Sequence, residues 1–282
     1  MAKKVLRPND INRSSDDGRL ISSIVNNKCV LIVGSEIMLS KSMYDEYDGD
    51  SHRMLFENVR EWLVKDKVIS EQHKANTFTQ LSKDIRNVDT IVRRLLADID
   101  SFSVSEMPDL LVELIKTRYF RLVLSTTVDP YIYNLMHEVW GDELRVMDIY
   151  ADNWEESYDF DKEVTSDDFL SMPPTLYYVF GRGFRLKSSE TRFAINDNDY
   201  IEVISKWMSN SAPKRLLKYI HSSRLIALGC KFDDWFFRFF WYMFLFQISL
   251  YCFCNGLDGF FVQIGMHGQA QYGIAELVSI GA

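Results

Sequence analysis

Five short apolar runs, each bounded by small or polar residues, constrain the fold of this chain more than any other feature. Runs of this length that are rich in Val, Ile, Leu and aromatic residues are typical of strands buried on both faces of a sheet. They occupy residues 28–34, 119–126, 143–150, 175–181 and 223–229. Between and after them, apolar residues at spacings of three and four predict helices at 130–139, 198–209 and 213–221. We expect Asp197 or Asn198 to cap the helix at 198–209.

The alternation of strands and helices predicts the α/β class, with a Rossmann-like, mainly parallel sheet and helices on both faces. A long helical insert follows the first strand, with helical spacing over 53–68, 77–99 and 104–118. Ordinary connections in compact domains are much shorter. We therefore expect residues 50–117 to form a helical cap on one core domain that spans residues 18–245.

The two ends of the chain differ in composition from this core. The polar run RPNDINRSSDDG predicts a flexible N-terminus over residues 1–17. All 32 Lys and Arg residues lie at or before Arg238, and the last 44 residues contain six of the 13 glycines. We therefore expect residues 246–282 to be an atypical Gly-rich, apolar tail outside the cooperative core. A membrane segment, a piece buried only against a partner, and a truncated or frame-shifted sequence would each have this composition.

The charge and the cysteines limit the class of protein. The formal net charge of −8 argues against a nucleic-acid-binding surface, which requires a basic face. No secretory signal precedes the core, and the four cysteines lack the spacing of metal ligands, so a cytoplasmic, reduced protein is expected. Cys29 and Cys230 lie in strand-like runs and are predicted to be small core residues.

Residues 239–254 form a hydrophobic stretch that is broken by Gln247 and Ser249. The stretch is shorter than the ~20 residues that span a bilayer. A buried helix is therefore the favoured interpretation, and association with a membrane through these residues is the alternative.

Small and charged residues follow the first and last predicted strands, where open α/β sheets usually bind ligands. Gly34 and Ser35 follow the first strand, and a glycine there lets backbone N–H groups approach a phosphate. A glycine at this point is also the ordinary way to turn the chain, and Glu36 would repel a phosphate unless a cation intervened. Gly229 ends the last strand, and Lys231 follows within reach of a ligand phosphate.

The second predicted strand ends in the sequence STTVDP, residues 125–130. Ser125, Thr126, Thr127 and Asp129 either carry chemistry at this strand end, or Asp129 only caps the helix that follows. Both interpretations use the same atoms, so the sequence leaves the choice open.

The strand ends VGSEI, STTVD, VFG and LGCKFDDWFFRFFW occur in the order and approximate spacing of the sirtuin-like domains found in bacterial antiphage proteins. The chain resembles this family from about residue 20 to 245, most specifically in the G-x-x-F-D-D-W stretch at 229–235. The resemblance implies an NAD-binding Rossmann-like domain. In active members, such a domain cleaves the bond between nicotinamide and ribose.

Active members of the family carry the motif Gly-Ala-Gly after the first strand, Thr-Asn-x-Asp after the second and His-Gly after a later strand. In this sequence Glu36 stands at a glycine position, Thr127 at the asparagine and Phe180 at the histidine. The residues of the pattern are present at Gly34, Thr126, Asp129 and Gly181. Phe180 removes the one side chain that titrates near neutral pH without perturbation, and loss of one general base commonly costs about 10²- to 10⁴-fold in rate.

The resemblance, with these changes, implies roles for two groups of residues. The catalytic positions are Thr127 and Asp129. The positions that bind the cofactor NAD are Gly34, Ser35, Glu36, Thr126, Gly181, Gly229 and Lys231.

The resemblance therefore implies a sirtuin-like domain of a bacterial defence-type protein that binds NAD⁺ or ADP-ribose with weak or lost catalysis, a pseudoenzyme. The alternative is an active NAD⁺ glycohydrolase, an NADase that depletes NAD⁺ and uses Asp129 together with Glu36. A second copy of the chain, or a fused or separate effector domain, is the expected macromolecular partner. Neither nucleic acid nor a membrane is expected as one.

Overall fold

The computed structural model describes most of the predicted core. Its described residues are 15–34, 39–40, 53–54, 63–73, 87–97, 109–150, 172–186, 191–208, 214–230, 260–265 and 274–279. None of the helices among them is long and apolar enough to cross a membrane.

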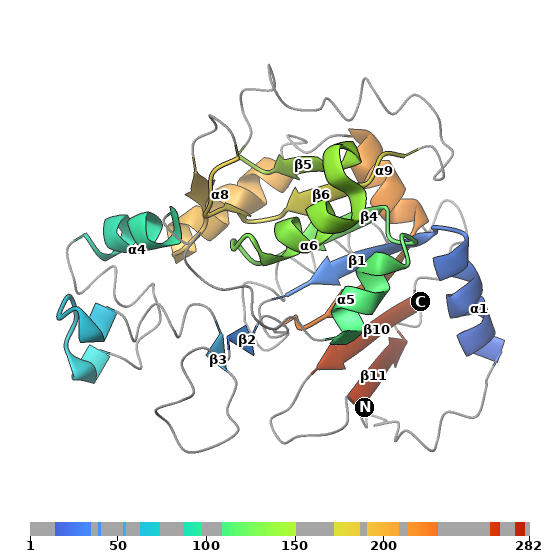
Figure 1. The fold of residues 1–282 in the computed structure, drawn as a ribbon, viewed down its shortest axis with the longest axis horizontal. Coiled ribbons are helices and arrows are strands. Elements are labelled where there is room, and N and C mark those ends of the chain that lie inside the picture. The colour runs from blue at the N-terminus through green and yellow to red at the C-terminus, as the bar shows by residue number, and fades with distance from the viewer. Residues whose placement is uncertain are drawn as a thin grey trace.

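A seven-stranded sheet lies at the centre of the fold, in the order β11-β10-β9-β1-β4-β6-β5 (Figure 1). Its strands are β1 (Cys29–Val33), β4 (Leu122–Ser125), β5 (Arg145–Asp148), β6 (Thr175–Tyr178), β9 (Arg224–Leu228), β10 (Phe260–Gly265) and β11 (Ile274–Ser279). Neighbouring strands pair in parallel, except that β11 runs antiparallel to β10. All five predicted strands are present, and the mainly parallel, Rossmann-like α/β fold is confirmed.

Helices cover both faces of the sheet, as predicted. On one face, α1 (Ser15–Val25), α5 (Asp109–Lys116) and α6 (Tyr131–Trp140) pack on a core that includes Leu31 and Val33. On the other face, α8 (Asp197–Met208) and α9 (Lys214–Ser222) pack on a second core that includes Val30 and Ile32. Figure 1 shows α6 in front of the sheet and α8 behind it. Because alternate residues of β1 point to opposite faces and both faces are covered, every residue of β1 is buried.

The two cysteines in predicted strands are core residues. Cys29 is fully buried, and Cys230, just after β9, is almost fully buried. Burial raises the pKa of the Cys29 thiol to about 12, because the thiolate is poorly solvated there. The Cys29 thiol is therefore unreactive at neutral pH.

Two of the three helices predicted for the insert are present in its described part. Helix α4 (Val88–Ala97) lies within residues 77–99, and α5 lies within residues 104–118. The first predicted helix, over 53–68, differs at its start. There β3 (Arg53–Met54) pairs with β2 (Leu39–Ser40), so backbone pairing overrides the helical spacing of the side chains. Residues 63–65, within the same predicted range, are helical, and two short 3₁₀ turns lie at η4 (Glu71–His73) and η6 (Gly141–Glu143).

The N-terminal boundary of the core lies earlier than predicted. Helix α1 begins at Ser15, inside the segment expected to be flexible over residues 1–17, and residues 1–14 lie outside the described part. Leu20 and Ile24, one helical turn apart, pack against the sheet, which explains the helix. This spacing was the overlooked signal.

The cap of α8 is Asn196, not Asp197 or Asn198. The Asn196 Oδ1 atom accepts hydrogen bonds from the backbone N–H groups of Asn198 and Asp199, at 3.0 and 3.1 Å. The helix therefore begins one residue earlier than its predicted start, and Asp197 is its first residue.

The C-terminal segment differs from the expectation of a tail outside the core. Strand β10 pairs in parallel with β9, and β11 pairs with β10 along its whole length. Residues 260–265 of the apolar run GFFVQIG form β10, which pairs with the side of β9 that β1 leaves open. Residues 239–254, with their alternative of membrane association, lie outside the described residues.

Candidate functional site

The carboxyl ends of the parallel strands meet at one edge of the sheet. The strand register aligns Leu228 of β9, Val33 of β1, Ser125 of β4, Tyr178 of β6 and Asp148 of β5 in one row. The residues that follow these strands are therefore neighbours. This is the edge at which open α/β sheets bind ligands.

The predicted strand-end residues gather at this edge. Gly34 and Gly229 follow adjacent strands, and Thr126 and Thr127 follow β4 beside them. Gly181 lies in β7 (Gly181–Arg182), which pairs with β8 (Arg192–Phe193) just beyond β6. Backbone hydrogen bonds from Val179 to Ser125 (2.9 Å) and from Gly183 to Val128 (2.7 Å) hold this segment against the end of β4.

Position 34 requires a glycine because its main chain lies very close to the residues that follow the neighbouring strand β9. Its N–H donates to the Leu228 carbonyl at 2.8 Å, which extends the pairing of β1 with β9. A methyl group on Gly34 would overlap the Gly229 carbonyl oxygen and lie 2.6 Å from the Cys230 Cα atom. The geometry thus gives this glycine a packing role, and its N–H is already used within the sheet.

The hydroxyl groups after β4 are engaged with each other and with the sheet. Thr126 donates its N–H to the Val33 carbonyl at 2.9 Å and its hydroxyl to the same oxygen at 3.2 Å. Ser125 Oγ and Thr127 Oγ1 lie 2.9 Å apart and share a hydrogen bond, and both residues are buried. These contacts fix the turn that precedes Asp129.

Asp129 performs the capping role with only one of its two carboxylate oxygens. Its Oδ1 atom accepts a hydrogen bond from the Tyr131 N–H at the start of α6, at 3.0 Å. Its Oδ2 atom is buried and accepts no hydrogen bond from any residue in the described part of the chain. The Tyr178 hydroxyl donates to the Asp129 backbone carbonyl at 3.1 Å, so the main chain is held as well.

Burial changes the acidity of this carboxyl group. Desolvation raises the pKa of Asp129 to about 6, because the charged form loses its water. The Tyr131 N–H and the nearby Thr127 side chain favour the charged form and limit the rise. At pH 7 the group is therefore mostly ionised but easily protonated. Such perturbed carboxyl groups are more frequent at functional sites than elsewhere.

Asp148 provides a direct comparison at the same edge and was not predicted from the sequence. Its Oδ1 atom accepts from the Tyr150 N–H at 2.8 Å, two residues on, as Asp129 accepts from Tyr131. Its Oδ2 atom accepts from Arg182 Nε at 2.6 Å in a nearly buried ion pair. Both oxygens of Asp148 are thus satisfied by the protein, in contrast to those of Asp129. An acidic residue at the end of the predicted strand 143–150 was the signal that could have identified it.

Phe180 and Gly181 are fixed by packing. The Phe180 ring is buried in the core and contacts the Tyr200 ring edge to face, with centroids 5.6 Å apart. Gly181 has a positive φ of 84°, and a side chain there would overlap the Arg192 carbonyl oxygen. The position at which the resemblance implies a histidine is therefore occupied by a core side chain.

Three predicted binding residues, Ser35, Glu36 and Lys231, lie outside the described residues. The structure does not test their roles. Within the described part of the chain, no three His, Cys, Asp or Glu side chains are grouped as metal ligands.

No protein-family model matches the sequence, and no curated protein is significantly similar to it.

Proposed function

We propose that this chain is a sirtuin-like domain of a bacterial defence-type protein that binds NAD⁺ or ADP-ribose and has weak or lost catalysis. The observation that carries the proposal is the Asp129 Oδ2 atom, which is buried at the strand ends and has no hydrogen-bond partner among the residues that the structure describes. An unsatisfied buried polar atom costs about 1–3 kcal/mol. A ligand that displaces the atoms covering this oxygen and donates a hydrogen bond to it would recover part of that free energy as affinity, and ribose hydroxyl groups are suitable donors.

Two features support weak catalysis. The Thr127 hydroxyl, at the position of an asparagine in the family pattern, is buried and hydrogen-bonded to Ser125. Phe180, at the histidine position, is buried in the core and has no group that can accept or donate a proton. Binding without efficient turnover is the function that these two residues favour.

Asp129 also favours a second candidate, an NAD⁺ glycohydrolase. With its pKa at about 6, most of the carboxyl group is ionised at pH 7. A carboxylate stabilises the oxocarbenium-like charge that develops when nicotinamide leaves the ribose. Asp129 would be the catalytic residue of this reaction.

Calorimetric titration with ADP-ribose tests the proposal. Asp129→Asn keeps the side-chain oxygen that can cap α6 and removes the charge. We expect it to weaken binding about tenfold or more, because hydrogen bonds to charged groups are the stronger ones. Asp142→Asn is the matched control, since the exposed Asp142 lies in η6 before β5, at the opposite edge of the sheet. Absence of binding by the unaltered protein, or equal effects of both substitutions, would contradict the proposal.

Release of free nicotinamide from NAD⁺ distinguishes the two candidates. The leading proposal predicts no steady release by the unaltered protein. Steady release that Asp129→Asn abolishes and Asp142→Asn leaves unchanged would establish the glycohydrolase instead.

A further inference from the structure

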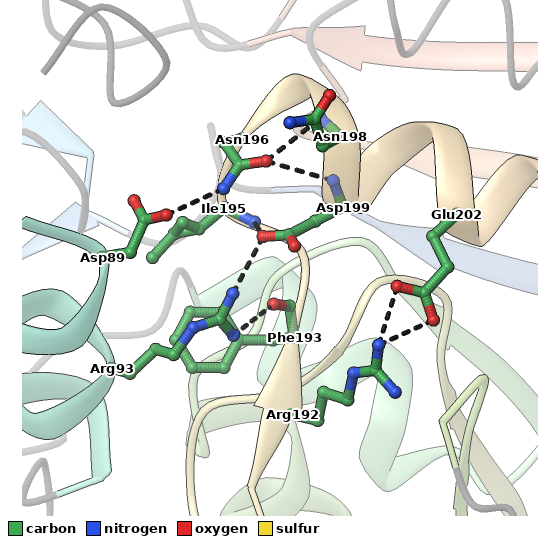
Figure 2. Close-up of polar contacts among 9 residues, drawn as sticks. All are labelled: Asp89, Arg93, Arg192, Phe193, Ile195, Asn196, Asn198, Asp199 and Glu202. Carbon is green, nitrogen blue, oxygen red and sulfur yellow. Dashed lines mark hydrogen bonds and ion pairs between the residues drawn. The ribbon is translucent and has the colours of Figure 1, made fainter. Parts of the chain in front are cut away.

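Helix α4 of the insert contacts the corner where β8 leads into α8. Arg93 of α4 donates one hydrogen bond to the Phe193 carbonyl oxygen, at 2.8 Å, and another to Asp199 Oδ2, at 2.9 Å. Its guanidinium group also lies over the Phe193 ring, 5.0 Å from the centroid. Figure 2 shows Arg93 reaching from α4 to both residues. One side chain of the insert therefore fixes both the main chain and a side chain of this corner.

A second polar contact joins the same two elements. Asp89, in the first turn of α4, accepts a hydrogen bond from Asn196 Nδ2 at 3.0 Å, while Asn196 Oδ1 caps α8 (Figure 2). Asp199 Oδ2, the partner of Arg93, also accepts from the Ile195 N–H at 3.0 Å. The groups that start α8 are thus the same groups that hold α4.

Apolar packing brings α4 to this place, and the polar contacts orient it. Val92 is fully buried in the same core as Phe193 and Val203. The Arg93 and Asp199 side chains are 33% and 21% exposed, and partly exposed ion pairs contribute little to stability. The main effect of the Arg93 contacts is therefore to fix the position of residues 193–199.

That position is transmitted directly to the strand ends. Phe193 pairs with Gly181, and the Ala194 N–H donates to the Phe180 carbonyl at 2.8 Å. Gly183, two residues after Gly181, donates its N–H to the carbonyl of Val128, which directly precedes Asp129. A continuous set of backbone contacts therefore connects the residue that Arg93 holds with the turn that carries Asp129.

We propose that Arg93 is a positioning residue, which sets the Gly181 to Gly183 edge of the site and couples the docking of α4 to ligand occupancy. The proposal rests on the proposed function for the identity of the ligand, ADP-ribose. Its physical basis is linkage: if docking of α4 favours the binding geometry, ligand must favour docking of α4 by the same factor.

Amide hydrogen exchange, with and without ADP-ribose, tests both parts of the proposal. Arg93→Gln removes the guanidinium group that donates hydrogen bonds to the Phe193 carbonyl oxygen and to Asp199 Oδ2. Glu202→Gln is the matched control, because it breaks the ion pair between Glu202 of α8 and Arg192 of β8, which does not involve the insert. We expect Arg93→Gln to increase exchange at the Ala194 and Gly183 amides about tenfold, and Glu202→Gln to leave it nearly unchanged.

In the unaltered protein, ADP-ribose should slow exchange in α4, although α4 would not touch the ligand. Arg93→Gln should abolish this slowing and weaken ADP-ribose binding about fivefold or more. Arg93→Lys, which keeps the charge, should restore part of the affinity. A merely structural role would not produce protection of α4 by the ligand.

Exchange at Ala194 and Gly183 that is unchanged in Arg93→Gln would overturn the proposal. So would ADP-ribose binding of equal affinity in Arg93→Gln and the unaltered protein. If the unaltered protein binds no ADP-ribose, the proposed function fails, and the exchange of the Gly183 amide without ligand still decides whether Arg93 positions the edge.

Discussion

At the scale of single residues, Asp129 and Asp148 show how similar side chains acquire different roles. Each follows a buried strand and accepts a hydrogen bond from the N–H two residues on. The difference is the second oxygen, which accepts a hydrogen bond from Arg182 in Asp148 and, in Asp129, has no partner among the described residues. The hydrogen bond from the Tyr131 N–H therefore accounts for only one of the two carboxylate oxygens of Asp129.

The raised pKa of Asp129 predicts a pH-dependent cost to stability. Because burial raises this pKa from 3.8 to about 6, the folded protein retains the proton in a pH range where the unfolded chain has lost it. The free energy of unfolding therefore falls as the pH rises from about 4 to about 6, by about 3 kcal/mol from this group. Asp129→Asn should be more stable than the unaltered protein by up to that amount at pH 7.5, with little difference near pH 4.

Urea denaturation of both proteins at the two pH values measures this effect. Asp148→Asn is the contrasting variant, because it removes the charged acceptor of the 2.6 Å contact with Arg182 and should cost about 1.5–3 kcal/mol. A stability difference for Asp129→Asn that does not change with pH would count against the buried, unsatisfied carboxylate.

Gly34 gives a second prediction at the scale of residues. A side chain there meets main-chain atoms of Gly229 and Cys230, which cannot move aside easily. Gly34→Ala should therefore lower the free energy of unfolding by about 1–3 kcal/mol or more. Gly18→Ala is the control, since Gly18 lies in α1 with nothing within 4 Å of the added methyl, and should be neutral or stabilising by up to about 1 kcal/mol. Equal thermal midpoints for the two variants would show that Gly34 is not closely packed.

At the scale of elements, the sequence predicted the regular structure well and the local contacts less well. The five strands were identified because strands buried on both faces are continuous apolar runs, whatever their neighbours. The cap of α8 was placed one or two residues too late because Asn196, Asp197 and Asn198 are all residue types that favour this position. The short β2 and β3 strands were missed because they depend on pairing between segments. The same reason explains the site: Asp129 was found from its place after a strand, whereas Arg182 and Arg93 act through partners distant in sequence.

The shared role of Asn196 can be separated into its two parts by substitution. Asn196→Ala should destabilise the protein by about 1 kcal/mol or more, because it removes both the cap of α8 and the contact with Asp89. Asn196→Ser keeps a capping oxygen and should recover most of the capping contribution without the Asp89 contact. Asn198→Ala, on the exposed side of the same turn, should change stability by less than about 0.5 kcal/mol. Chemical denaturation of the three variants measures these differences, and an Asn198 effect as large as that of Asn196 would exclude the assigned cap.

At the scale of the whole molecule, the C-terminal strands change what deletion should do. The composition of the segment after residue 250 suggested that its removal would leave stability unchanged, whereas β10 now lies against β9. A chain that ends at Tyr251 should therefore expose one edge of β9 and lose about 1–2 kcal/mol, which lowers the thermal midpoint by several degrees. A chain that ends near residue 270 loses only β11 and should melt between the two. Identical thermal midpoints for all three chains would show that the segment after residue 250 lies outside the cooperative core.

The central claim is that a nucleotide binds where the parallel strands end, next to Asp129. The most direct measurement is amide hydrogen exchange of the unaltered protein with and without saturating ADP-ribose, resolved by residue. The account predicts slower exchange at residues 126–131 and 181–183, which follow β4 and β6 at the carboxyl edge, and no change at residues 222–224 at the opposite edge, where β9 begins. Protection confined to the opposite edge, or none at a concentration that saturates binding, would contradict it.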